Sequence, residues 1–110
     1  MKIRRGNIVR VDFGDAPAAK QGERPAVVVQ NDVGNKKSTS TIVLPFTTKP
    51  TRLPIAVKVE INESNLPHPC WVICEPMTIS KSQVLEIHSI LDEKVMGKID
   101  SALKINLALE

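Results

Sequence analysis

The sequence is poor in aromatic residues: it has no tyrosine, one tryptophan and two phenylalanines, together 3% of 110 residues. Hydrophobic residues still make up 42% of the chain and charged residues 25%, which is typical of a globular protein and not of a disordered one. Valine, isoleucine and leucine must therefore fill most of the core. The length suits a single domain, which we expect to span residues 1–110.

The chain also lacks a long hydrophobic run. About 18 consecutive apolar residues are needed for a membrane helix, and no such stretch occurs. The N-terminal residues MKIRRGNIVRVDF start basic, but their apolar part is too short and too interrupted by charge for a signal peptide. These absences predict a cytoplasmic protein without membrane contact.

Cysteine is scarce, and the motifs of common enzymes are missing. In an extended CWVIC segment, Cys70 and Cys74 would lie about 13 Å apart, whereas a disulfide needs Cα atoms within about 7 Å. His68 and His88 stand alone, so we expect neither a metal site nor a cofactor. We predict a turn position for His68 and a half-exposed strand or helix position for His88, without a direct role. The signatures of serine hydrolases, P-loop proteins and zinc proteases are absent.

Short β-branched segments dominate the rest of the sequence. The pattern of apolar and polar residues predicts strands over residues 8–13, 25–30, 39–47, 55–61 and 71–75, and a short strand or a turn over 78–80. Loops or turns are expected over residues 14–22, 32–38 and 49–54, while residues 62–69 break the pattern and residues 82–90 are ambiguous. Asp92 is a candidate N-cap for a final helix with an apolar stripe of Met96, Ile99, Leu103 and Leu107. The pattern predicts a mainly β fold, a small bent antiparallel barrel with a C-terminal helix.

Positive charge is modest but unevenly placed. The formal net charge is +3 and the pI about 9.0, which permits a polyanionic partner without requiring one. The basic residues gather near the N-terminus and in or beside expected loops: Lys2, Arg4, Arg5, Arg10, Lys20, Arg24, Lys36, Lys37, Lys49 and Arg52. A solvated basic surface would give the same pattern.

Arg24 stands where a charged loop meets an apolar strand, in the stretch GERPAVVVQND. Pro25 favours an extended backbone at Arg24. An antiparallel hairpin that turns at Gly34-Asn35 sets Asn31 opposite Ser40 and Arg24 opposite Thr47, with Cβ atoms about 5 Å apart. A guanidinium fixed beside a hydroxyl suits a phosphate group. The candidate substrate-binding residues around this pair are Lys20, Gln21, Glu23, Asn31, Thr48, Lys49 and Arg52. The alternative is an Arg24 that pairs with Glu23, Asp12 or Asp32, with Thr47 only ending a strand.

Four segments in this order resemble the MazF/PemK family of toxin endoribonucleases. They are G-x-I-V-x-V-D-F from Gly6, G-x-R-P-x-V-V-x-Q-N-D from Gly22, T-I-V followed by P-x-T-T, and the late T-I-S before the terminal helix. The resemblance runs from Gly6 to about Leu109. It implies an SH3-like barrel that forms a homodimer, cleaves single-stranded RNA, chiefly messenger RNA, at short motifs without a metal, and is inhibited by a cognate antitoxin. The family's catalytic arginine and threonine fall on Arg24 and Thr47.

The chain departs from its relatives at two acidic positions. Many relatives carry an acidic residue where this chain has Ala19 and Lys20, and some have a carboxylate where it has Cys74. A third catalytic carboxylate and a general base are therefore not assigned. Trp71 has two interpretations, stacking on a base or packing in the core or a dimer.

Two rival functions remain from the residues alone. A gyrase poison of the CcdB type has a similar barrel but acts through a C-terminal Trp-Gly-Ile, whereas this sequence ends Leu-Ala-Leu-Glu110. A non-catalytic RNA-binding barrel would use the same basic loops without cutting the strand. The order and spacing of the four segments favour the endoribonuclease.

Overall fold

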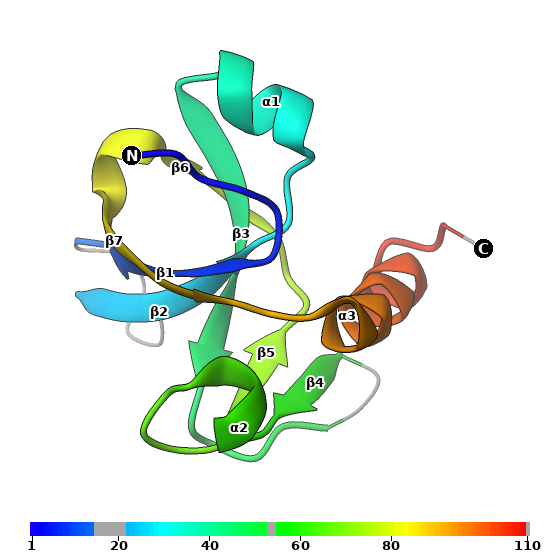
Figure 1. The fold of residues 1–110 in the computed structure, drawn as a ribbon. Helices are drawn as coiled ribbons and strands as arrows, with labels where there is room; N and C mark the ends of the chain where they lie inside the picture. The colour runs from blue at the N-terminus through cyan, green and yellow to red at the C-terminus, as the bar shows by residue number, and fades with distance from the viewer. Residues whose placement is uncertain (15–21, 53–54, 110) are drawn as a thin grey trace.

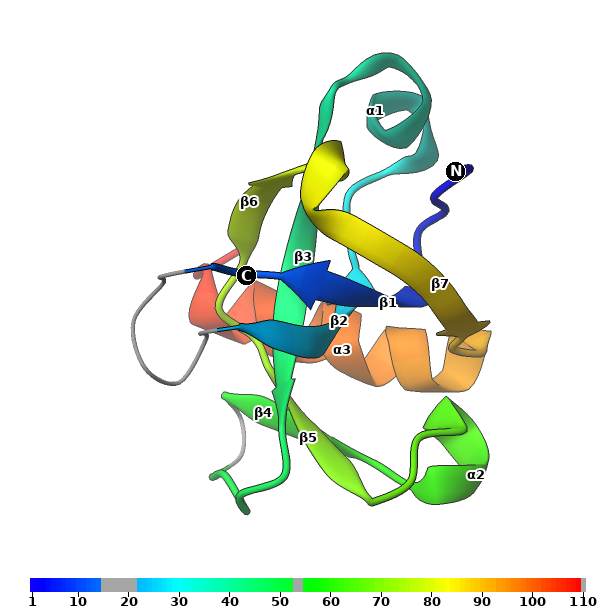
Figure 2. The same cartoon turned by 90° about the vertical axis from the view of Figure 1, so that its left-hand side faces the viewer.

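The computed structural model describes residues 1–14, 22–52 and 55–109 and shows an antiparallel sheet with a C-terminal helix (Figures 1 and 2). The strands are β1 (Asn7–Asp12), β2 (Glu23–Val28), β3 (Ser40–Thr47), β4 (Ala56–Val59), β5 (Cys70–Ile73), β6 (Met77–Ser80) and β7 (Val84–Ile90). The helices are α1 (Asp32–Lys37), α2 (Ile61–Ser64) and α3 (Glu93–Asn106), and a 3-10 turn covers Lys81–Gln83.

The sheet is organised around β3. Its strand order is β4-β5-β3-β2-β1-β7, and β6 pairs with β3 beside this path. One edge of β3 pairs with β2, while the other pairs first with β6 and then, at its end, with β5. The predicted fold class, antiparallel β with a C-terminal helix, is confirmed. In the described part of the chain the pairings leave the sheet open, so the barrel is incomplete.

The predicted register between β2 and β3 is confirmed. Ala26 pairs with Pro45, Val27 with Leu44 and Val28 with Val43, which is the pairing that sets Arg24 opposite Thr47. The predicted turn over residues 32–38 is wrong, because the chain there forms the short helix α1. The number of connecting residues is the same in both cases, so the register does not change.

Side-chain hydrogen bonds within residues 30–41 explain why α1 replaces the turn. The Asn31 side chain caps the helix by accepting a hydrogen bond of 2.8 Å from the backbone N–H of Gly34. The Asn35 side chain is buried; it donates to the carbonyl of Gln30 at 2.9 Å and accepts from the Thr41 hydroxyl at 2.7 Å. These bonds satisfy buried polar groups, which outweighs the preference of Gly-Asn for a turn.

Two apolar clusters form the core, and branched aliphatic residues supply most of both, as composition predicted. One lies between the sheet and α3 and includes Ile8, Leu44 and Ile99; the other includes Val9, Val43 and Ile79. The predicted helix cap is confirmed, since the Asp92 carboxylate accepts from the backbone N–H of Val95 at 2.9 Å. No helix in the described residues is long and apolar enough to cross a membrane.

Two local expectations need correction, and one open assignment is resolved. Leu107 does not extend the buried stripe of α3, because the helix ends at Asn106 and the Leu107 side chain is exposed. The strand expected over 55–61 is shorter, and Ile61–Ser64 form α2, where Glu63 accepts a hydrogen bond from the backbone N–H of Glu60 at 2.9 Å. The ambiguous segment 82–90 contains β7, which pairs with β1.

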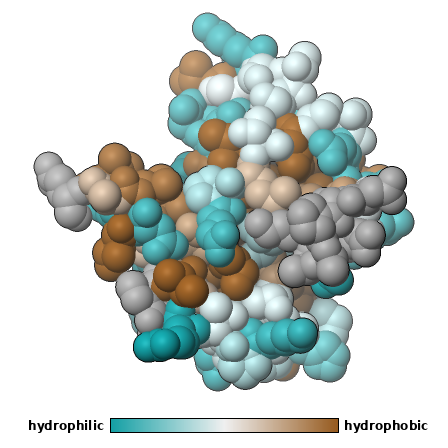
Figure 3. Space-filling view, turned by 180° about the vertical axis from the view of Figure 1, so that it is seen from behind, coloured by the Kyte–Doolittle hydropathy of each residue, from teal (hydrophilic) through white to brown (hydrophobic). Residues whose placement is uncertain are grey.

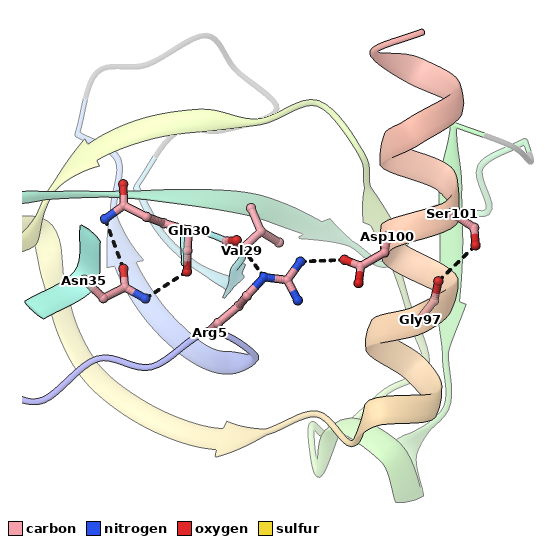
Figure 4. A network of polar contacts seen from close by, with 7 residues as sticks. All are labelled: Arg5, Val29, Gln30, Asn35, Gly97, Asp100 and Ser101. Atoms are coloured by element: carbon pink, nitrogen blue, oxygen red, sulfur yellow. Dashed lines mark hydrogen bonds and ion pairs between the residues drawn. The ribbon is translucent and has the colours of Figure 1, made fainter. Parts of the chain in front are cut away.

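Arg5 ties the N-terminal segment to the end of β2 and to α3 (Figure 4). Its Nε donates to the Val29 carbonyl at 2.9 Å, and its guanidinium forms an ion pair with Asp100. The backbone N–H of Arg5 also donates to the Asp32 carboxylate at 2.7 Å. This last hydrogen bond, with a second one from Asn35, lowers the pKa of Asp32.

The lowered pKa of Asp32 predicts a pH-dependent contribution to stability. A carboxylate whose pKa is depressed by folding stabilises the protein above its unfolded pKa of about 3.9, and this contribution disappears as the pH falls through the folded pKa. We expect Asp32→Asn to lower the free energy of unfolding at neutral pH, with a smaller difference in acid. Urea denaturation over a pH series measures this, with Lys94→Ala as control. A difference that stays constant with pH would contradict the assignment.

Candidate functional site

Arg24 and Thr47 line one surface hollow of about 160 Å³, which we call the Arg24–Thr47 hollow. Arg24 enters it from the start of β2, and Thr47 from the end of β3. The complete lining is Arg24, Pro25, Phe46, Thr47, Thr48, Lys49 and Cys70. Both key side chains are half-buried, which limits their motion and still leaves them accessible.

The sheet fixes the backbone of Arg24 through β1. Val11 is its register partner there, and Arg10 is that of Pro25; on the other side, β2 pairs with β3 from Ala26 onward. Pro25 has no backbone N–H, which is tolerated at the start of the strand. The guanidinium therefore starts from a rigid backbone position, as the sequence predicted.

The Thr47 hydroxyl lies within a tight local turn. Its Oγ1 accepts a hydrogen bond of 3.2 Å from the backbone N–H of Lys49. A hydroxyl that accepts one hydrogen bond can still donate its proton to another group. The turn also brings Thr48 and Lys49 beside Thr47.

The three carboxylates considered as alternative partners of Arg24 are each bound by other groups. Glu23 forms an ion pair with Arg10. Asp12 accepts from the backbone N–H of Gly14 at 2.9 Å, and Asp32 accepts from Arg5.

The structure brings together only some of the predicted substrate-binding residues. Thr48 and Lys49 lie in the Arg24–Thr47 hollow. Arg52 is exposed in the segment after β3, and Asn31 caps α1 beyond the far end of β2. Lys20 and Gln21 lie outside the described residues, as does Ala19.

A second hollow, of about 240 Å³, shares Arg24 and Pro25 with the first. Glu23 lies here, with Arg10, Glu86 and His88 and with apolar residues that include Leu66 and Pro67. Arg10 forms ion pairs with both Glu23 and Glu86. Arg10 reaches this hollow through the pairing of β1 with β2, and Glu86 through the pairing of β7 with β1. The second pairing could not be predicted, because residues 82–90 are ambiguous in the sequence. His88 is exposed on β7, and its Nε2 is hydrogen-bonded to the Asn65 carbonyl at 2.9 Å.

Neither cysteine is suited to act as a nucleophile. Cys70 and Cys74 are buried and do not form a disulfide, as predicted. Burial raises the pKa of Cys70, and raises that of Cys74 to about 11, so both thiols stay protonated at neutral pH. Among the described residues, no group of three or more histidine, cysteine, aspartate or glutamate side chains could hold a metal ion.

Part of the N-terminal basic cluster lies elsewhere. Lys2 and Arg4 line a separate hollow of about 530 Å³ with Asp32, Lys36 and Lys81. The N-terminus and α1 lie near the start of β3, whereas Thr47 ends it (Figures 1 and 2). The cluster therefore does not contribute to the Arg24–Thr47 hollow.

Both the sequence and the fold are similar to those of known proteins. A model of the PemK-like, MazF-like toxins of type II toxin–antitoxin systems matches residues 4–107. Endoribonuclease EndoA of Bacillus subtilis (strain 168) is 32% identical, over 99% of this chain and 97% of the relative. Endoribonuclease MazF of Staphylococcus epidermidis is 33% identical, over 97% and 92%. The solved structure of an endoribonuclease in complex with its cognate antitoxin, from mycobacterial species, aligns with a TM-score of 0.84 at 23% identity, over 98% and 97%.

Proposed function

Because the chain belongs to the family of PemK-like and MazF-like toxins of type II toxin–antitoxin systems, we propose that it is an endoribonuclease that cleaves single-stranded messenger RNA at short sequence motifs. Single strands are the expected substrate because their unstacked base edges are accessible to protein side chains. The scissile phosphate binds in the Arg24–Thr47 hollow.

The reaction is an internal transesterification. The ribose 2′-oxygen attacks the adjacent phosphorus and loses its proton as the new P–O bond forms. The bond from phosphorus to the 5′-oxygen breaks, and that oxygen gains a proton. The products are a 2′,3′-cyclic phosphate and a 5′-OH end, and no water is consumed.

Arg24 and Thr47 divide the catalytic work. The Arg24 guanidinium stabilises the negative charge that develops on the non-bridging phosphate oxygens, which is the task of a pre-oriented donor. Thr47 donates to one of these oxygens or orients the 2′-OH for in-line attack. The observation that carries this proposal is the shared hollow, in which a cation and a hydroxyl from two paired strands face one small space.

The remaining predicted contacts extend this site. Thr48 and Lys49 line the same hollow and contact the phosphate backbone. Arg52, Lys20 and Gln21 bind flanking nucleotides.

Exposed apolar surface suits protein partners. Apolar side chains gather where α3 ends (Figure 3), and Ile55, Ile105, Leu107 and Leu109 are exposed. Leu85, Ile87 and Ile90 are exposed on the edge strand β7. We assign these surfaces to a homodimer and to a cognate antitoxin that covers the RNA site.

The proposed function is tested by analysing the cut ends of a defined oligonucleotide. We expect fragments with 2′,3′-cyclic phosphate and 5′-OH ends, formed at the same rate in EDTA. Fragments with 5′-phosphate ends, or cleavage that stops in EDTA, would contradict the transesterification. Intact RNA under all conditions would favour a non-catalytic RNA-binding protein.

A further inference from the structure

The only tryptophan of the chain stands outside the core. Trp71 lies on β5 between the buried residues Cys70 and Val72, and its own side chain is half-buried. Side chains alternate between the two faces of a strand, so the indole points to the face opposite to Val72. In the described part of the chain, neither apolar cluster includes Trp71. The largest apolar side chain therefore has no established packing role.

Strand pairing places Trp71 in a row with Thr47. Thr47 of β3 is the register partner of Trp71, and Trp71 is also the register partner of Lys58 in β4. Directly opposed residues in antiparallel strands share one face, with Cβ atoms about 5 Å apart. The residues next to them in the three strands are buried and point to the core face: Phe46, Val72 and Val57. Thr47, Trp71 and Lys58 thus lie side by side on the outer face.

Continued by two residues, the register of β2 with β3 sets Arg24 opposite Thr47, so Arg24 extends this row on the other side of Thr47. Adjacent strands are separated by about 4.8 Å, so Trp71 lies one strand from Thr47 and Lys58 lies two strands away. Along the row, a cation and a hydroxyl (Arg24 and Thr47) are followed by the aromatic ring of Trp71 and then by a second cation, Lys58. A nucleic acid strand offers a matching sequence of groups, because each sugar between two charged phosphates carries a flat base that can stack on an aromatic ring.

The Lys58 ammonium is already placed beside the ring. Its Nζ lies 5.5 Å from the centre of the Trp71 ring, a cation–π contact, and 3.6 Å from a Glu60 carboxylate oxygen. The Lys58 side chain is half exposed, which leaves its ammonium accessible to a phosphate. A base can then stack on the indole while the ammonium keeps a negatively charged partner.

We propose that Trp71 is the stacking surface for the base of the nucleotide that adjoins the scissile phosphate, and that Lys58 binds the next phosphate. This inference rests on the proposed function, because it takes the Arg24–Thr47 hollow as the site of the scissile phosphate. Trp71 sets the position of the strand and contributes to the choice of nucleotide, whereas Arg24 and Thr47 perform the chemistry.

The first test uses the fluorescence of the parent protein, which has one tryptophan and no tyrosine. The probe is an oligonucleotide with a 2′-deoxy substitution at the cleavage position, so that it binds without being cut. We expect saturable quenching of Trp71, and loss of the quenching when the adjoining nucleotide is made abasic. Binding of the full oligonucleotide without a change in fluorescence would overturn the proposal.

The second test compares Trp71→Ala and Trp71→Phe. A base stacks equally in the bound substrate and in the transition state, so we expect the alanine variant to raise KM about tenfold or more with kcat nearly unchanged. Trp71→Phe should restore most of the affinity, and an abasic substrate should cancel the difference between the parent and Trp71→Ala. Ile61→Ala, at an exposed apolar residue of α2, is the matched control.

Two other outcomes are decisive. In one, Trp71→Ala changes the oligomeric state, and abasic RNA binds the parent protein and quenches its fluorescence as unmodified RNA does. The ring then packs between copies of the chain, and the proposal is overturned. If intact RNA quenches the Trp71 fluorescence, abasic RNA does not, and the protein cuts no RNA, then the stacking site stands and the proposed function fails.

Discussion

Arg24→Ala is expected to lower kcat/KM for RNA cleavage by about 10²- to 10³-fold. The guanidinium supplies the positive charge at the phosphate oxygens, and water entering the hollow would replace it poorly. Because Arg24 lies at the start of β2 and outside both apolar clusters, the fold should persist. Single-turnover cleavage of a defined oligonucleotide measures the effect, and thermal unfolding checks the fold.

Matched variants separate geometry from charge. Arg24→Lys keeps the positive charge but loses the planar fork of donors, so we expect an activity between those of the parent and Arg24→Ala. Thr47→Val keeps the shape of the side chain without the hydroxyl and should also cut more slowly. Lys94→Ala removes an exposed cation on α3 and should leave cleavage unchanged. Parent-like rates for both Arg24→Ala and Thr47→Val would show that the site lies elsewhere.

A single 2′-deoxy substitution at the cleavage position is expected to abolish cutting of an otherwise identical RNA. The proposed nucleophile is that 2′-oxygen, and no other group of the site replaces it. Binding should weaken only slightly, about fivefold or less, because a single hydrogen bond contributes about 1 kcal/mol. Gel cleavage assays and fluorescence anisotropy with labelled oligonucleotides measure the two effects separately.

The position of the substitution provides the control. A 2′-deoxy nucleotide placed one position away from the cleavage site leaves the nucleophile intact, so cutting should continue. Cleavage of the substrate that lacks the attacking 2′-OH would mean that water is the nucleophile. In that case the role given to Thr47 in orienting the 2′-OH would be wrong.

The position of Arg24 opposite Thr47 could be predicted from the sequence, because it depends on local patterns. Alternating apolar residues define β2 and β3, Pro25 restricts Arg24, and the number of connecting residues sets the register. The sequence did not predict that the connection between β2 and β3 contains a helix. The buried Asn35 side chain is hydrogen-bonded to the Gln30 carbonyl and the Thr41 hydroxyl. These side-chain hydrogen bonds select a helix where Gly34-Asn35 alone favours a turn.

The surroundings of the pair depend on the strands that have the weakest patterns. β7 pairs only with β1 among the described strands and exposes residues on both faces, so its sequence lacks the alternation that marks a half-buried strand. The approach of Glu86 and His88 to Arg24 follows from that pairing and was missed. The row of Thr47, Trp71 and Lys58 likewise requires the register of β5 with both its neighbours.

The most direct test of the central claim is a crystal structure of the protein bound to RNA that carries a 2′-deoxy substitution at the cleavage position. We predict that the phosphate on the 3′ side of that nucleotide lies in the Arg24–Thr47 hollow. Its non-bridging oxygens should be about 2.7–3.1 Å from the Arg24 guanidinium and from the Thr47 hydroxyl. A scissile phosphate bound outside this hollow, with Arg24 and Thr47 in contact with neither it nor the ribose, would contradict the account.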